Sequence, residues 1–159
     1  MNRHLQHTIV YRCLILAFLF LVTLTMSAQW AAKPQDPAVP AYNSAPPPKN
    51  TKQPAILTKA DLWGDDARFT YQTHAYELAA KIPNVLHQQP CYCYCDRMGH
   101  KSLRTCFEGT HGAKCSVCLR ELYYAYQQNK NGVKAAEIRA GIIAGEWRHI
   151  DLQTAADIN

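Results

Sequence analysis

Patterns that identify several common classes of protein are missing from this chain of 159 residues. No segment alternates apolar and polar residues over enough positions to predict a β-strand. The net charge is +5, but the lysines and arginines are scattered and form no basic stripe with interleaved aromatic residues. Neither a fold built on a sheet nor a nucleic-acid partner is therefore expected.

Two redox cofactors also lack their sequence signatures. The Cys-x-x-Cys motif at Cys115 to Cys118 is followed by Leu119, whereas covalent attachment of c-type haem requires a histidine at that position. The amino-terminal region has no twin-arginine pair, so an exported chain would cross the membrane unfolded. An iron–sulfur cluster would be unusual in such a protein, and neither cofactor is expected.

Residues 1–28 have the pattern of a secretory signal peptide. Arg3 and Arg12 precede an apolar run over residues 14–22, and small residues follow from Ser27. The run is shorter than the ~20 residues that a membrane-spanning helix needs. We therefore predict a cleaved signal and an exported protein, in the periplasm or at the cell surface. Membrane attachment is expected only if this segment is not cleaved.

Most of the 9 prolines lie in the next segment, residues 29–57. Proline fixes φ and removes a backbone donor, and this segment has too few apolar residues to form a core. We predict a disordered linker here, then one domain over residues 58–151 and a short tail over residues 152–159. A domain of ~95 residues buries only a modest core, so metal ions or disulfides would help to stabilise it.

The domain is predicted to be all-α, with a cysteine-rich loop region at its centre. Apolar residues at helical spacing predict helices over residues 67–82, from Cys115 to the Asn131-Gly132 stop, and over residues 133–147. Residues 58–61 resemble a capping box at the start of the first helix. The predicted apolar stripe of the last helix consists of Ala136, Ala140, Ile143 and Trp147, with Ile138 and Ile142 beside it.

Apart from Cys13 in the predicted signal, the cysteines are crowded together in the domain. Three occupy alternate positions, and side chains two apart in an extended chain are too far apart for an unstrained disulfide. Cross-links over such short loops also gain little entropy. Soft thiolates favour Cu(I) and zinc. We therefore predict a metal site for Cu(I), with zinc as second choice, whose ligands are Cys91, Cys93, Cys95, Cys106, Cys115, Cys118, His100 and His111.

This interpretation makes the protein a carrier, store or deliverer of metal rather than an enzyme, with an exported metalloenzyme or metal transporter as its partner. Two other interpretations stay open. Six thiols in an exported protein also suit a disulfide-stapled structural or interaction domain. A thiol–disulfide oxidoreductase acting through Cys115 and Cys118 is a weaker alternative, because no βαβ pattern surrounds the pair.

The stretch from Pro83 to Leu122 is similar to bacterial exported proteins named for a Pro-Cys-Tyr-Cys-Gly-Cys motif. The resemblance continues beyond the motif, at Gly99-His100-Lys101-Ser102-Leu103, Cys106-Phe107, the Cys-x-x-Cys pair and Ile138-Arg139. This chain departs from the motif at Tyr94, where the family has glycine. The family has no established activity, so the resemblance implies that the cysteines act as a unit but names no ligand.

Overall fold

A computed structural model describes residues 39–159, so the predicted signal peptide and the first part of the predicted linker lie outside the described residues. The described chain contains helices and no β-strand, which confirms the all-α prediction. No helix in this part of the chain is long and apolar enough to cross a membrane. The α-helices are α2 (Thr70–Lys81), α3 (Pro83–Leu86), α4 (His111–Lys114), α5 (Ser116–Lys130) and α6 (Ala135–Ala144).

Single turns of 3-10 helix connect or follow the α-helices. They are η1 (Lys59–Asp61), η2 (Gly64–Ala67), η3 (Cys95–Met98), η4 (Leu103–Phe107), η5 (Glu146–His149) and η6 (Ala155–Asp157). Two of them, η3 and η4, lie between α3 and α4, in the segment predicted to be a cysteine-rich loop region. This segment is therefore a series of tight turns rather than an extended chain.

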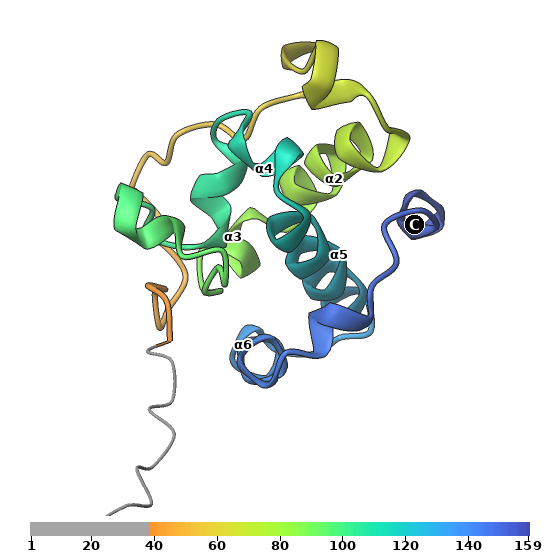
Figure 1. Cartoon of the computed structure of the whole chain (residues 1–159). Helices are drawn as coiled ribbons and strands as arrows, with labels where there is room; N and C mark the ends of the chain where they lie inside the picture. Colours follow the sequence, from red (N-terminus) through yellow and green to blue (C-terminus); the bar gives the residue numbers. More distant parts are fainter. Residues whose placement is uncertain (1–38) are drawn as a thin grey trace, which may run out of the picture. The chain divides into compact units, whose positions relative to one another are not determined.

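Helix α5 is central to the fold. Helix α2 packs along it, and α6 and η5 pack against it from another side (Figure 1). The core between these elements is formed by fully buried side chains that include Tyr76, Leu122 and Tyr123. The Tyr124 hydroxyl of α5 donates a hydrogen bond to Glu146 Oε2 of η5 at 2.6 Å, which joins the two elements at their contact.

The capping box lies where the sequence predicts it, but it does not start the long helix. Asp61 Oδ2 accepts hydrogen bonds from the backbone N–H and the hydroxyl of Thr58, both at 2.7 Å, and this closes η1. Gly64, at φ 59°, then turns the chain away. Helix α2 begins later than predicted, where the Gln72 side chain accepts the Phe69 N–H at 2.7 Å.

The predicted apolar stripe of the last helix is wrong by a rotation about the helix axis. Ile138 and Ile142 are fully buried, whereas Ile143 is 42% exposed. Gly141 explains the difference, because it lets the Tyr124 ring lie where a Cβ would otherwise project. This close approach turns the Ile138–Ile142 face of α6 towards α5. The helix ends at Ala144 because Gly145 adopts the left-handed conformation, with φ 83°.

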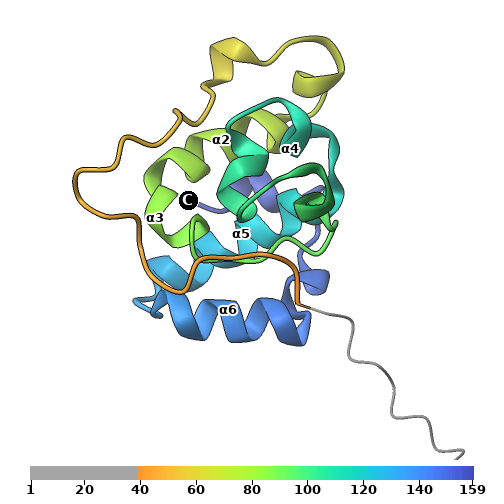
Figure 2. The same cartoon turned by 90° about the vertical axis from the view of Figure 1, so that its left-hand side faces the viewer.

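Residues 39–57, the described part of the predicted linker, contain no helix but contact the helical domain (Figure 2). The Leu57 N–H donates to the Phe107 carbonyl at 3.0 Å, and the Asn43 amide donates to the His87 carbonyl at 3.0 Å. The predicted tail over residues 152–159 also packs on the domain, because Leu152 and Ala155 are buried.

Candidate metal centre

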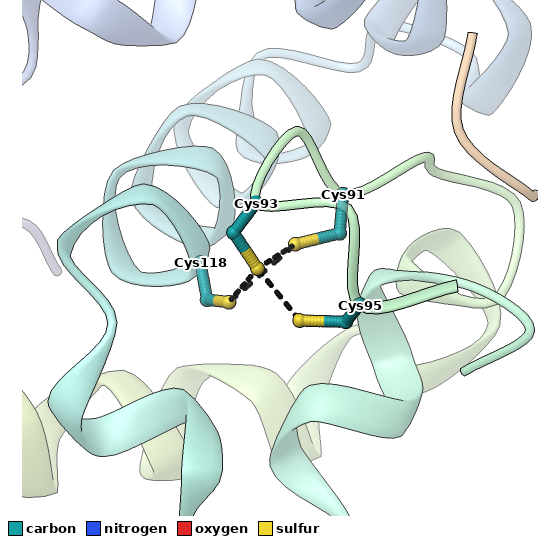
Figure 3. A group of neighbouring side chains, drawn as sticks. All are labelled: Cys91, Cys93, Cys95 and Cys118. Carbon is teal, nitrogen blue, oxygen red and sulfur yellow. Dashed lines mark hydrogen bonds between the residues drawn. The ribbon is translucent and has the colours of Figure 1, made fainter. Parts of the chain in front are cut away.

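The three alternate cysteines lie in a compact turn that runs from the end of α3 to Cys95, the first residue of η3. The Tyr94 N–H donates to the Cys91 carbonyl at 3.0 Å, and Tyr94 adopts the left-handed conformation, with φ 57° and ψ 36°. This turn points the three thiols at one another, so that Cys93 Sγ lies 2.6 Å from Cys95 Sγ and 3.3 Å from Cys91 Sγ (Figure 3). In this turn the sulfur atoms of neighbouring alternate cysteines are therefore close together, unlike those of cysteines two apart in an extended chain.

Helix α5 brings two more thiols to the same place. Cys118, in its first turn, lies 3.5 Å from Cys93 Sγ and 3.4 Å from Cys91 Sγ (Figure 3). Cys115 is the residue immediately before the helix. Cys106, on η4, completes the cluster, with its Sγ 3.8 Å from Cys91 Sγ. The predicted thiol ligands thus come from the turn, from η4 and from the start of α5.

Both predicted histidines reach this cluster. His111 Nε2 lies 2.9 Å from Cys95 Sγ, and His100 Nδ1 lies 3.3 Å from Cys106 Sγ. His111 is the first residue of the short helix α4 rather than part of a loop, whereas His100 follows Gly99, which has φ 94°. The two imidazole rings meet edge to face, with centroids 5.5 Å apart.

A glycine sets the position of α4 relative to the cluster. Gly112 is buried, and a Cβ there would lie 2.7 Å from the Cys106 carbonyl oxygen and 3.2 Å from the Tyr76 hydroxyl. The Tyr76 hydroxyl in turn donates to the Gly109 carbonyl at 2.7 Å and accepts the Ala113 N–H at 3.1 Å. These contacts hold His111 and Cys106 on neighbouring segments that face the same thiols.

The side chains form three overlapping groups whose donor atoms lie within 4.8 Å of one another. Each group supplies only sulfur, or sulfur and imidazole nitrogen. No carboxylate belongs to any such group within residues 39–159. The groups are Cys91, Cys93, Cys95 and Cys118; Cys93, Cys115, Cys118 and His111; and Cys95, Cys106 and His100.

All the cysteines between residues 39 and 159 are free thiols. Cys93 Sγ and Cys95 Sγ lie 2.6 Å apart, beyond the ~2.05 Å of a disulfide bond. Four sulfurs around zinc at ~2.3 Å would be separated by ~3.8 Å, the edge of the tetrahedron. Four of the six sulfur–sulfur distances within the first group are 2.6 to 3.5 Å, which is shorter than this edge. Metal binding would therefore require only small outward movements of the side chains.

The thiols and imidazoles influence one another's ionisation. Hydrogen bonds from Cys106, Cys115, Cys118 and Cys91 lower the pKa of Cys93, which favours a thiolate at the centre of the cluster. The same kind of contact, led by Cys106, raises the pKa of Cys118. Burial, followed by the charge of His111, lowers the pKa of His100 and so favours its neutral imidazole. Neutral imidazole is the form that binds a metal ion.

A position at the amino-terminal end of a helix usually lowers the pKa of a cysteine. The pKa of Cys115, at the start of α5, is instead raised. Hydrogen bonds with Cys118 lower this pKa. The hydrogen bond with Cys93 and burial raise it by a larger amount, so the net shift is upward. The crowding of thiols therefore outweighs the effect of the helix end.

Sequence reasoning missed one residue beside the cluster. Glu121 is fully buried on α5, its Oε1 accepts the Tyr92 N–H at 2.7 Å, and its Oε2 has no hydrogen-bond partner. Burial raises the pKa of Glu121 to about 8, although the Tyr92 N–H and the Cys91 side chain oppose this shift. Its position three residues after Cys118 was a usable signal, because that spacing places both side chains on one helix face.

No curated protein and no solved structure matches this chain. One family of proteins does match, and it is described as a protein of unknown function with PCYCGC motif. The sequence model of this family covers residues 65–148, which is more than half of the chain and includes every residue of the thiol and imidazole cluster. The chain therefore belongs to the family of proteins of unknown function with the PCYCGC motif.

Proposed function

We propose that this protein binds soft metal ions through its cysteine cluster, Cu(I) in preference to zinc, and that it is an exported protein for metal carriage, sequestration or delivery. One observation carries the proposal. Thiols from the turn after α3, from η4 and from the start of α5 converge on one place, with two imidazoles at its edge. The fold thus gathers donors that are far apart in the sequence.

The donor chemistry favours soft metals. Thiolate sulfur suits Cu(I) and zinc, whereas magnesium and calcium prefer the oxygen ligands that the three groups lack. Cu(I) is preferred over zinc because six of the eight donors are sulfur. Cys91, Cys95, Cys106 and Cys118 are buried, and buried thiolates are stable only when a cation balances their charge. Bound metal ions supply this charge directly.

The exposure of the cluster supports carriage rather than a permanent structural role. Cys93 and Cys115 are partly exposed, and His111 is exposed, while the other thiols lie deeper. Metal ions can therefore reach the cluster and leave it from one side, as transfer to an exported metalloenzyme or a transporter requires. Export itself is part of the proposal and rests on residues 1–28, outside the described part of the chain.

A disulfide-stapled domain is the second candidate, because the same proximity of sulfur atoms would also allow oxidation. Cys91 and Cys118, with sulfur atoms 3.4 Å apart, would connect the turn directly to α5 in such a protein. This candidate predicts three defined disulfides and no metal in the isolated protein. Metal analysis, a free-thiol count and peptide mapping can therefore distinguish this candidate from the metal-binding proposal.

The test is a metal analysis and a free-thiol count on protein recovered from the exported fraction, with non-reducing peptide mapping of the same sample. The reduced protein is then titrated with Cu(I) and, separately, with zinc against a competing chelator. We expect bound metal, free thiols after metal removal, and tighter binding of Cu(I) than of zinc. Three mapped disulfides, no metal and no tight binding by the reduced form would show that the proposal is wrong.

A further inference from the structure

The number of metal ions follows from how the three donor groups overlap, and this inference rests on the proposed function. The first and second groups share Cys93 and Cys118, and the first and third groups share Cys95. Cys106 and Cys115 belong to different groups, the third and the second. One ion cannot bind both of them together with the shared thiols, because a zinc or copper ion takes at most about four such ligands.

A single ion in the first group would also leave buried donors without a partner. Cys106 is buried and His100 Nδ1 lies 3.3 Å from its sulfur, but neither belongs to the first group. The same ion would also leave Cys115 and His111 unused. The arrangement therefore offers more donors than one ion can use, around a common set of thiols.

Cys93 lies at the centre of this arrangement. Its sulfur is 2.6 Å from Cys95 Sγ, 3.3 Å from Cys91 Sγ and 3.5 Å from Cys118 Sγ, and Figure 3 shows these thiols pointing towards it. A thiolate sulfur has more than one lone pair and can bind two ions at once. A sulfur with donors of two groups around it is therefore placed to bridge.

We propose that the site binds a polynuclear metal cluster, in which the shared sulfurs bridge neighbouring ions: Cys93 and Cys118 between the first and second groups, and Cys95 between the first and third. Cys106 and Cys115 are terminal ligands. Each cysteine that binds loses its thiol proton to solvent, and a bridging thiolate releases only this one proton for two ions. The clustered thiols can thus release no more than six protons, however many ions bind. Monovalent Cu(I) ions would neutralise the thiolates one charge at a time.

The test uses reduced protein from the exported fraction, loaded with Cu(I) in one sample and with ¹¹³Cd²⁺, as a zinc analogue, in another. Native mass spectrometry counts the ions, and ¹¹³Cd NMR detects scalar coupling between two cadmium ions that share a sulfur. We expect more than one ion per chain and coupled cadmium resonances. X-ray absorption of the copper sample should show a copper–copper scattering shell.

Variants identify the bridging sulfurs. Cys106→Ser, which removes a proposed terminal ligand, should lower the ion count by at most one and keep the cadmium coupling. Replacing both Cys93 and Cys118 by serine should abolish the coupling between the ions of the first and second groups, because no other thiol is shared by these two groups. If the double variant does not fold, the wild-type spectrum still decides the question.

The outcomes separate this inference from the proposed function. A single bound ion would overturn the polynuclear cluster but leave metal binding intact. Two or more ions without any cadmium coupling would mean separate sites and would also overturn it. Absence of tight metal binding would overturn both proposals.

Discussion

Glu121 Oε1 accepts the backbone N–H of Tyr92 at 2.7 Å, so a fully buried carboxylate on α5 holds the turn that carries Cys91 and Cys93. The link is direct, because Tyr92 lies between the two cysteines. The second carboxylate oxygen has no hydrogen-bond partner. A group of this kind positions the cysteines and at the same time makes the stability of the protein depend on pH.

The first prediction concerns this pH dependence in reduced, metal-free protein. The pKa of Glu121 is raised in the fold from 4.5 to about 8, so between these values the folded state retains a proton that the unfolded state releases. The contribution of Glu121 to the free energy of unfolding should therefore fall as the pH rises from 4.5 to 8, by up to a few kcal/mol. Glu121→Gln, which still accepts the Tyr92 N–H, should lack this fall.

Chemical denaturation of both proteins at several pH values measures the effect. The informative quantity is the difference between wild type and variant, because every other titratable group is present in both proteins. Parallel curves for the two proteins from pH 5 to pH 8 would contradict the prediction.

The second prediction concerns Tyr94, the residue that replaces the glycine of the family motif. Its left-handed conformation costs a residue with a Cβ about 1–2 kcal/mol relative to glycine. The Arg97 guanidinium lies 5.0 Å from the Tyr94 ring centroid, a contact worth about 0.5–1 kcal/mol. Tyr94→Gly should therefore raise the free energy of unfolding by roughly 0.5 kcal/mol, measured by denaturant unfolding, and should keep every metal ligand.

Tyr92→Gly is the matched control, because Tyr92 is in the same turn but has no positive φ. It should lower the stability, since glycine there adds freedom to the unfolded chain without relieving strain. Equal effects of the two substitutions would show that the left-handed conformation at Tyr94 does not control the turn.

The third prediction concerns Gly112 and the approach of α4 to the cluster. In Gly112→Ala the new Cβ would meet the Cys106 carbonyl at 2.7 Å, and relief of this clash should cost about 1–3 kcal/mol of stability. The shift should also separate His111 from Cys95 and weaken metal binding. Gly109→Ala is the control, because a Cβ there has no neighbour within 4 Å, and a change within about 0.5 kcal/mol is expected.

Thermal unfolding and metal titration of both variants check this prediction. Equal stability and affinity in the two alanine variants would contradict it, because only Gly112 has a backbone atom in the way.

The helical fold could be predicted from the sequence because apolar spacing is a local property of the chain. Helix α5 ends at Lys130, before Asn131 and Gly132, as the stop signal indicated. The face of α6 could not be predicted in the same way. It depends on Tyr124 of another helix, which lies against Gly141 and thereby turns Ile138 and Ile142 inward.

The convergence of the thiols could not be predicted from the spacing of the cysteines in the sequence, because it depends on the backbone conformation between them. An extended chain was assumed for the alternate cysteines, and only the backbone conformation of Tyr94 shows that their sulfurs meet. Glu121 was missed because an acidic residue on a mostly apolar helix is usually solvated. In its buried position it accepts the Tyr92 N–H, which comes from a segment 29 residues away in the sequence.

The last prediction concerns metal removal and acid. Bound ions stabilise the folded state by RT ln(1 + [L]/Kd), about 4 kcal/mol when the free metal is 1,000 times Kd. Metal removal from the reduced protein should therefore lower the melting temperature by on the order of 15 °C. Metal binding should weaken as the pH falls, because protons compete for the thiolates. Cys93→Ser should lose more metal than Tyr94→Gly, which keeps every ligand. Titration of the three proteins at pH 7 and pH 5 decides the matter, and equal metal content in both variants would leave Cys115 and Cys118 as the remaining candidate ligands.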